Sequence, residues 1–228
     1  MSDSAKRFNV GVVIVGAGKG KRLGLKIDKA LLPLAGKPLF LRTVAIFENL
    51  QEIKQIVLVL GKRYCAPAKK MMHDKNIAVV EGGSQRQDSV RKGLFALRGD
   101  INYVLIHDVA RPFVSNETLN RILKALKRYP AVICAVAAKD AVKTVKNGCV
   151  RKTLSRESLV LVQTPQGFKK ELILRAYSRL KNTKLYDDAQ AVELMGKKVR
   201  VVEGDYSNMK ITYPGDIELA HYICHEKL

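Results

Sequence analysis

A glycine-rich segment that also carries lysines and an arginine follows the first apolar run of the chain. It reads Gly16-Ala-Gly-Lys-Gly-Lys-Arg-Leu-Gly24, and two further lysines, Lys26 and Lys29, come soon after it. Glycines let a backbone approach a ligand closely and turn its N–H groups toward phosphate oxygens. Cations beside such a turn neutralise phosphate charge. The pattern therefore predicts a binding loop for a polyanionic ligand.

Two common glycine loops do not fit this spacing. A dinucleotide fingerprint needs glycine where Lys21 stands, followed directly by a helix and later by an acidic residue that holds a ribose. A Walker loop needs glycine where Val15 stands and a hydroxyl residue where Arg22 stands. Both a Rossmann-type oxidoreductase and a P-loop NTPase are therefore disfavoured.

The composition predicts a folded, basic chain. Its 228 residues include 41 Lys and Arg against 21 Asp and Glu, a formal charge of +20. The cations occur singly or in pairs, no aromatic residues are interleaved with them, and tryptophan is absent, so a nucleic-acid-binding domain is a distant alternative. Four scattered cysteines suggest neither a disulfide framework nor a zinc site. No apolar run reaches the roughly 18 residues of a membrane span, and no targeting segment is recognisable, so we expect a cytoplasmic location.

Strand and helix signals alternate along the chain, so the glycine-rich loop should lie at the carboxyl edge of a sheet. Apolar β-branched runs predict strands, and apolar residues at helical spacing predict helices between them. Such alternation predicts an α/β fold with a doubly wound, mostly parallel, Rossmann-like sheet. The expected strands are 10–16, 56–60, 77–80, 103–106, 131–137, 159–162, 199–202 and 209–212; the expected helices are 38–50, 66–73, 85–97, 115–128, 168–180, 187–195 and one from Pro214 onward.

One segment departs from this alternation. Asn147-Gly148, a strong hairpin signal, separates 141–145 from 149–154, and the segment has many charges and few large apolar residues. We therefore expect residues 1–228 to form a single domain with a projecting β-hairpin arm at about 139–157.

Six segments, taken together and in this order, are characteristic. They are Ala17-Gly-Lys-Gly-Lys-Arg22 with Lys29, Gly82-Gly83-Ser-Gln-Arg86-Gln-Asp88-Ser89-Val90, His107-Asp108-Val-Ala110-Arg111-Pro112, Thr153-Leu-Ser-Arg156, Gln163-Thr164-Pro165-Gln166 and Glu203-Gly204-Asp-Tyr-Ser-Asn208-Met-Lys210-Ile-Thr212. With these segments the chain resembles the 2-C-methyl-D-erythritol 4-phosphate cytidylyltransferase family of isoprenoid precursor biosynthesis. The resemblance covers nearly the whole length, from Val12 to the terminal helix, and implies the nucleotidyltransferase fold.

The resemblance implies transfer of CMP from CTP to a polyol phosphate, with release of pyrophosphate and with Mg²⁺ or another divalent cation as cofactor. It implies a homodimer in which the arm at 141–154 reaches the partner, and no nucleic acid or membrane partner. It assigns catalysis to Arg22 and Lys29, and substrate positioning to Arg111, Arg156, Thr164 and Lys210. The implied CTP contacts are Ala17, Gly18, Gly20, Gly82, Gly83, Arg86, Ser89, Asp108 and Ala110, and Asp108 is also a candidate metal ligand beside the phosphates of CTP.

Three departures from the family pattern bear on the acceptor substrate. Asp28-Lys29-Ala30 replaces the usual Pro-Lys-Gln, Ala141 stands where the arm usually has Thr, and Tyr186-Asp187 replaces Thr-Asp. The changes at 141 and 186 fall at the polyol end of the implied site. The acceptor therefore stays open between 2-C-methyl-D-erythritol 4-phosphate and another polyol phosphate such as ribitol 5-phosphate.

Overall fold

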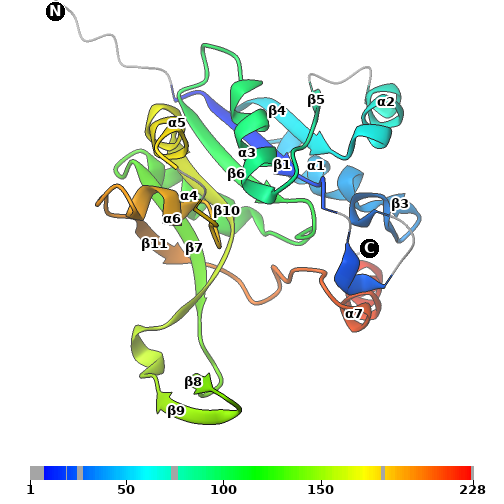
Figure 1. The fold of residues 1–228 in the computed structure, drawn as a ribbon. Helices are drawn as coiled ribbons and strands as arrows, with labels where there is room; N and C mark the ends of the chain where they lie inside the picture. The colour runs from blue at the N-terminus through cyan, green and yellow to red at the C-terminus, as the bar shows by residue number, and fades with distance from the viewer. Residues whose placement is uncertain (1–7, 19, 25–27, 73–76, 181–182, 227–228) are drawn as a thin grey trace, which may run out of the picture.

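The fold is built on one seven-stranded sheet, drawn in Figure 1 from a computed structural model that describes residues 8–18, 20–24, 28–72, 77–180 and 183–226. The strand order is β11-β7-β10-β6-β1-β4-β5, and β10 is antiparallel to both of its neighbours while the other pairings are parallel. This confirms the expected α/β class. The strands are β1 (Val10–Val15), β4 (Ile53–Leu60), β5 (Ile77–Glu81), β6 (Tyr103–Asp108), β7 (Ala131–Ala137), β10 (Val160–Lys169) and β11 (Arg200–Glu203).

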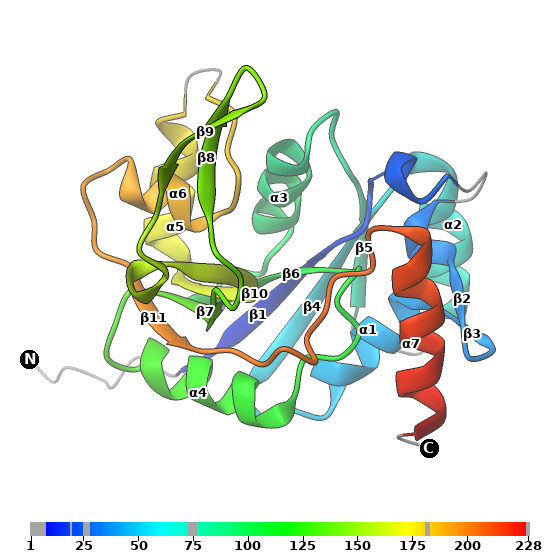
Figure 2. The same cartoon turned by 90° about the horizontal axis from the view of Figure 1, so that it is seen from below.

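Helices cover both faces of the sheet, as Figure 2 shows. Successive side chains of a strand point to opposite faces. Accordingly Val12 and Ile14 of β1 pack with one set of helices, and Val13 packs with the other. The first set comprises α1 (Leu39–Glu48), α2 (Lys62–Met71) and α4 (Asn116–Leu126); the second comprises α3 (Arg86–Phe95), α5 (Lys170–Ser178) and α6 (Ala189–Glu193).

A strand replaces the predicted start of the fifth helix. The sequence pattern predicted a helix from Phe168, but β10 continues to Lys169 and α5 begins only at Lys170. Phe168 is fully buried and pairs with neighbouring strands on both sides. Gly167 lies so close to α4 that a Cβ atom would stand 2.7 Å from Leu126. The prediction was wrong because Pro165 and Gly167, which usually end a strand, stand here inside one, next to a register shift in its pairing with β7.

The segment 209–212 was also predicted as a strand, and this prediction was wrong. It crosses the carboxyl edge of the sheet without joining it. The backbone N–H of Ile211 donates to Ala110 at 2.9 Å, and its carbonyl accepts the Lys29 ammonium at 2.6 Å. These hydrogen bonds hold the segment at that edge of the sheet, and Lys210 therefore lies there. Helix α7 (Pro214–Glu226) follows, and the small strands β2 (Pro33–Leu34) and β3 (Lys37–Pro38) lie beside it.

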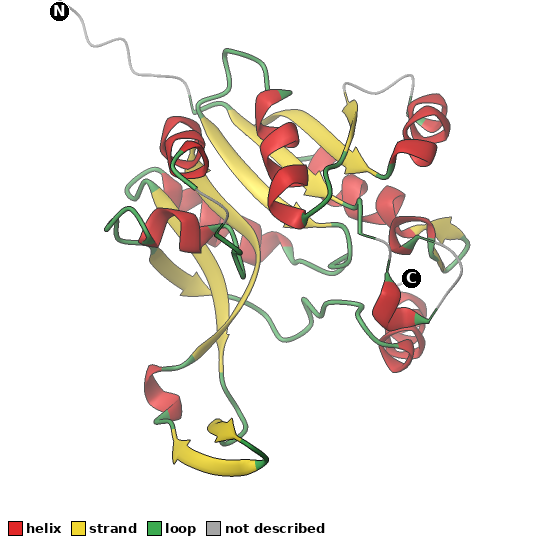
Figure 3. Cartoon of the chain, in the orientation of Figure 1, coloured by secondary structure: helices red, strands yellow, loops and turns green. Residues whose placement is uncertain are grey.

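The predicted hairpin is present and leaves the body of the molecule, as Figures 1 and 3 show. Strands β8 (Lys143–Lys146) and β9 (Cys149–Thr153) pair antiparallel, and every residue in both strands is exposed. Asn147 and Gly148 have φ of 50° and 77°, the left-handed pair that a tight hairpin turn requires. Elsewhere, no helix within the described residues is both long and apolar enough to cross a membrane.

Candidate active site

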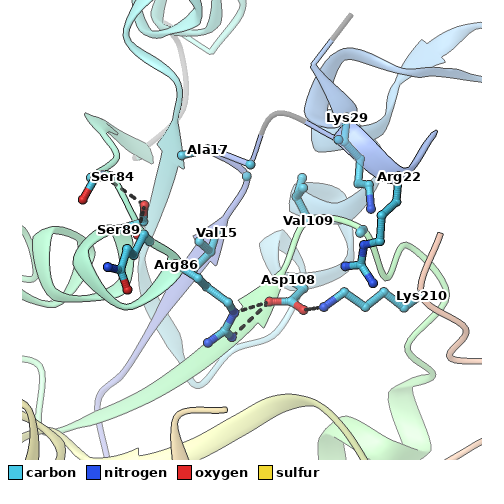
Figure 4. A pocket seen from close by; sticks show the side chains of 16 residues that line it. Val15, Ala17, Arg22, Lys29, Ser84, Arg86, Ser89, Asp108, Val109 and Lys210 are labelled. Carbon is cyan, nitrogen blue, oxygen red and sulfur yellow. Dashed lines mark hydrogen bonds and ion pairs between the residues drawn. The ribbon is translucent and has the colours of Figure 1, made fainter. Parts of the chain in front are cut away.

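A cavity of about 650 Å³ opens where β1 and β6 end, at the carboxyl edge of the sheet (Figure 4). Open α/β sheets bind their ligands at this edge. The cavity collects residues from the glycine-rich loop, the start of α3, the end of β6 and the 209–212 segment. The lining residues are Val15, Gly16, Ala17, Gly18, Gly20, Arg22, Lys29, Gly83, Ser84, Gln85, Arg86, Ser89, Asp108, Val109, Ala110 and Lys210.

The glycine-rich loop passes close to the turn before α3. Gly20 has φ of +59°, which L side chains rarely adopt, and a Cβ on Gly82 would overlap the side chain of Ala17. Gly82 itself stays behind the cavity wall, where its N–H donates to Leu60 at 2.8 Å. Glycines thus allow two loops to form one wall. Lys19 and Lys26, which the sequence pattern included, lie outside the described residues.

Three cations from separate parts of the chain meet on one side of the cavity. Figure 4 shows Arg22, Lys29 and Lys210 there, from the glycine-rich loop, the 3₁₀ turn after it and the 209–212 segment. Burial, together with the nearby charges of Lys210 and Arg22, lowers the pKa of Lys29 to about 8. Like charges held this close favour an anionic ligand, because such a ligand relieves their repulsion.

Asp108 lies between two of the cavity's cations. Arg86 donates to Oδ1 of this carboxylate at 3.1 Å and Lys210 donates to Oδ2 at 2.5 Å. Burial would raise the pKa of Asp108, but Arg86 and Lys210 outweigh it and hold the pKa far below its usual range. Asp108 is therefore ionised throughout the neutral range and fixes the spacing of the two cations.

A buried pair behind Arg86 completes this charge network, and the sequence reasoning missed it. The Arg86 guanidinium donates to both carboxylate oxygens of Asp188, at 2.7 and 3.0 Å, and the Tyr177 hydroxyl donates to Asp188 at 2.6 Å. Asp188 is fully buried and does not line the cavity. The available signal was an acidic pair, Asp187-Asp188, at the start of a predicted helix in a basic chain.

Thr164 and His107 lie beneath the cavity floor. The Thr164 hydroxyl accepts the Asp108 N–H at 3.1 Å and contacts Nδ1 of His107 at 3.1 Å, while Nε2 of His107 lies 3.0 Å from the Arg111 carbonyl. A carbonyl only accepts, so Nε2 carries the proton and the Thr164 hydroxyl donates to Nδ1. Burial lowers the pKa of His107 to about 4, so the ring is neutral at pH 7.

Two predicted positioning residues lie away from the cavity. Arg111 donates to the Asn208 carbonyl at 2.6 Å and is partly buried. Arg156 stands exposed at the base of the arm and donates to the Lys139 carbonyl at 3.2 Å. Folding therefore brings Lys210 into the cavity but does not bring Arg156 there within one chain. Conversely, Ser84 and Gln85 line the cavity although the sequence reasoning did not single them out.

Comparisons with known proteins agree with this geometry. Residues 10–226 match the family model described as 2-C-methyl-D-erythritol 4-phosphate cytidylyltransferase. Curated relatives with that name include one from Bacillus mycoides, 40% identical over 94% of this chain and 97% of its own length, and one from Clostridium perfringens, 42% identical over 92% and 96%.

Solved structures give the same result. A 4-diphosphocytidyl-2C-methyl-D-erythritol synthase from Anaerococcus prevotii has a TM-score of 0.85 and 33% identity, covering 95% of this chain and 98% of its own. The cytidylyltransferase from Thermus thermophilus has a TM-score of 0.81 and 34% identity, covering 95% and 99%. Because the family model matches residues 10–226 and these relatives share the fold and nearly the whole length of the chain, the chain belongs to the 2-C-methyl-D-erythritol 4-phosphate cytidylyltransferase family.

Proposed function

We propose that this enzyme transfers CMP from CTP to 2-C-methyl-D-erythritol 4-phosphate and releases pyrophosphate. The observation that carries the assignment is the meeting of Arg22, Lys29 and Lys210 beside a glycine-rich turn in one cavity. A triphosphate would bring negative charge to these three cations, of which Lys210 is already paired with Asp108. The family name, shared by relatives over nearly the full length, identifies the nucleotide and the acceptor.

The reaction needs little proton transfer. The attacking group is a phosphate oxygen of the acceptor, which is already largely ionised near neutral pH. His107 is buried and neutral beneath the cavity floor, so its role in this proposal is structural and it transfers no proton. What the barrier requires is stabilisation of charge on the α-phosphoryl group and on the departing pyrophosphate. Arg22 and Lys29 supply it, and Lys210 holds the acceptor phosphate in line.

The turn before α3 forms the nucleobase side of the cavity. Gly83 donates its N–H to the Ser89 hydroxyl at 3.0 Å, and Ser84 donates to Asp88 at 2.7 Å, so the turn is held rigid. Rigid backbone groups can match the amino donor and ring acceptors of cytosine and reject uracil. In this proposal the ribose of CTP lies beside Ala110, which also lines the cavity.

Asp108 does not fit as a resident metal ligand. Both of its oxygens face cations, and no group of three acidic, His or Cys side chains suited to a metal ion occurs in the described part of the chain. We propose instead that Mg²⁺ or another divalent cation arrives on the phosphates of CTP, whose oxygens are the hard ligands that Mg²⁺ prefers. The protein then binds the complex through its cations and backbone amides.

We further propose a two-fold dimer in which the arm crosses to the partner subunit. The arm exposes Val145 and Val150, and the adjoining start of β10 exposes Leu161 at 53% of its surface. An isolated two-stranded ribbon is marginally stable in water, so a second surface is needed to hold it. Crossing also gives Arg156 a site to act in, because it lies outside the cavity of its own chain.

Pyrophosphate release tests the function directly. The protein is incubated with Mg²⁺ and CTP, UTP or ATP, each with 2-C-methyl-D-erythritol 4-phosphate or ribitol 5-phosphate. We expect release with CTP and the methylerythritol phosphate, and a fall in kcat of about 10²–10³ in Arg22→Ala. Release only with ribitol 5-phosphate would assign the other acceptor. No release, together with steep salt-dependent binding of RNA, would assign a nucleic-acid-binding domain.

A further inference from the structure

A second hollow, of about 560 Å³, lies between the start of β7, helix α5 and the start of β11. Five cations from two separate segments line it, against a single carboxylate. The cations are Lys169, Arg175, Lys197, Lys198 and Arg200, and the carboxylate is Glu171. Like the first cavity, this hollow therefore brings basic residues from separate parts of the chain together on a concave surface.

The charges in this hollow are not balanced by the protein. Within the described ranges, none of the five cations forms an ion pair with a carboxylate, whereas Arg86 and Lys210 in the first cavity both do. All five side chains are exposed, and like charges that share a small concave surface repel one another and attract anions to it. A bound anion is the simplest way to relieve this repulsion.

The hollow also has an apolar side. Leu172, which is 6% exposed, and Tyr129, which is 40% exposed, both line it. The guanidinium carbon of Arg200 lies 5.2 Å from the centroid of that ring, so a cation is held above a flat apolar face. A ligand that matches both features carries phosphate groups at one end and an apolar or planar body at the other.

Its position separates this hollow from the candidate active site. Strands β7 and β11 run parallel, and the hollow lies at their amino ends, near Ala131 and Arg200. The first cavity lies at the carboxyl ends of β1 and β6. The arm also departs from the carboxyl end of β7, so a partner bound through the arm would approach the opposite end of the strand (Figure 1).

We propose that this hollow is a second ligand site, for a small molecule that carries two or more phosphate groups on an apolar or planar body. Its volume is that of a small-molecule site, within the roughly 300–1,000 Å³ usual for such sites. Its concavity favours a compact ligand over an extended nucleic-acid strand, which would need cations arranged along a line.

Calorimetric titration of the full chain with inorganic tripolyphosphate, at about 0.15 M salt to screen exposed charges, tests the proposal. We expect two binding events per chain. Hydrogen exchange should locate one at the glycine-rich loop and the other at 129–131, 169–175 and 197–200. In Lys198→Glu/Arg200→Glu the second event should weaken at least about tenfold, because charge-assisted contacts are lost.

The matched control is Lys62→Glu/Arg63→Glu. It makes the same change in net charge on exposed residues of α2, and Arg63 lies over the Tyr64 ring at 4.5 Å, much as Arg200 lies over Tyr129. This control should keep both events. A wild-type protein that shows no binding at 129–131, 169–175 and 197–200, or equal weakening in both double variants, would overturn the proposal.

A second probe tests the apolar side. An alkyl diphosphate should bind the hollow more tightly than inorganic pyrophosphate does, and Tyr129→Ala should remove that difference. Equal affinities in the wild-type protein would overturn the apolar assignment. These binding measurements do not depend on turnover, so their result is separate from that of the pyrophosphate assay.

Discussion

Lys29 is a cavity cation whose protonation changes within the pH range used for assays. Its folded pKa of about 8 lies below its ordinary value of 10.5, because burial and two neighbouring cations disfavour the charged form. In the proposed mechanism the charged form of Lys29 stabilises the departing pyrophosphate, and the free enzyme loses this form as pH rises through about 8. We expect kcat/KM to fall over that interval in a pH profile.

Lys29→Arg provides the control for this pH dependence, because a guanidinium stays charged at these pH values. Its kcat/KM should be lower than that of the wild type at pH 7 but nearly flat between pH 7 and about 9. A wild-type profile that stays flat through pH 8, or a variant that keeps the wild-type decline, would contradict the assignment of the titrating group to Lys29.

Arg86 depends on a carboxylate that never reaches the cavity. Asp188→Asn removes one of the two carboxylate charges that the guanidinium faces, and it abolishes one of the two hydrogen bonds between these side chains, because the new amide nitrogen can only donate. We expect kcat/KM for CTP to fall about 10–100-fold, with KM for CTP rising more than KM for the acceptor. Tyr177→Phe, which removes one hydrogen bond to Asp188, should show a smaller loss in the same direction.

Asp187→Asn separates positioning from general damage to α6. Asp187 accepts from Gln190 at 3.0 Å and from Gln166 at 2.9 Å, at the start of the same helix, and has no contact with Arg86. This variant should keep kcat/KM within about threefold of the wild type. Equal losses in the Asp187 and Asp188 variants would show that the effect comes from helix disruption alone.

At the scale of elements, Thr164 joins β10 to β6. Its hydroxyl accepts the Asp108 N–H and donates to His107, and all three groups are buried. Thr164→Val keeps the shape but leaves two buried polar atoms unpaired, so the free energy of unfolding should fall by about 1–3 kcal/mol in urea titration. Thr164→Ser keeps the hydroxyl, so its free energy of unfolding should fall by less. Equal losses of unfolding free energy in the two variants would contradict the assignment of this contact between β10 and β6 to the hydroxyl.

Helix α3 approaches β1 through Gly93. A Cβ at this position would overlap the side chain of Val13, with Val59 at 3.0 Å. Alanine is the better helix former by about 1 kcal/mol, but overpacking a core costs about 1–3 kcal/mol. We therefore expect Gly93→Ala to lower Tm. Gly99→Ala, where a Cβ meets open space, should leave Tm nearly unchanged. A rise in Tm for Gly93→Ala would mean that the contact relaxes freely.

At the scale of the whole molecule, the arm decides whether one chain is sufficient for turnover. Deletion of residues 143–152 removes an exposed ribbon that contributes nothing to the core clusters. If the arm crosses to a partner, the shortened protein should sediment as a monomer. It should bind CTP with near-normal affinity in calorimetry, because the first cavity is intact, and it should release almost no pyrophosphate.

Subunit mixing gives the complementary result. An Arg156→Ala chain and a Lys29→Ala chain, each inactive alone, should recover part of the activity when mixed, because one site of the mixed dimer then has both residues. Full activity in a monomeric arm deletion would refute the shared site, and the arm would then act within its own chain.

Local patterns in the sequence determined much of this protein. The buried run 10–15, the glycine-rich loop after it and the Asn147-Gly148 turn are each readable over a few residues, because conformational preferences and alternation act at short range. They predicted the class of fold, the edge of the sheet at which the candidate cavity lies, and the hairpin. They also placed Arg22 and Lys29 together, since the two are only seven positions apart.

Tertiary structure alone decided the rest. Phe168 belongs to a strand because it pairs with β6 on one side and with β7 on the other. This pairing outweighs the tendency of Pro165 and Gly167 to end a strand. Lys210 reaches Asp108 across 102 positions, and Asp188 reaches Arg86 across 102. Contacts between such distant residues depend on how the chain packs, and they carry no signature in the residues beside them. The charge network of the cavity is therefore a property of the fold.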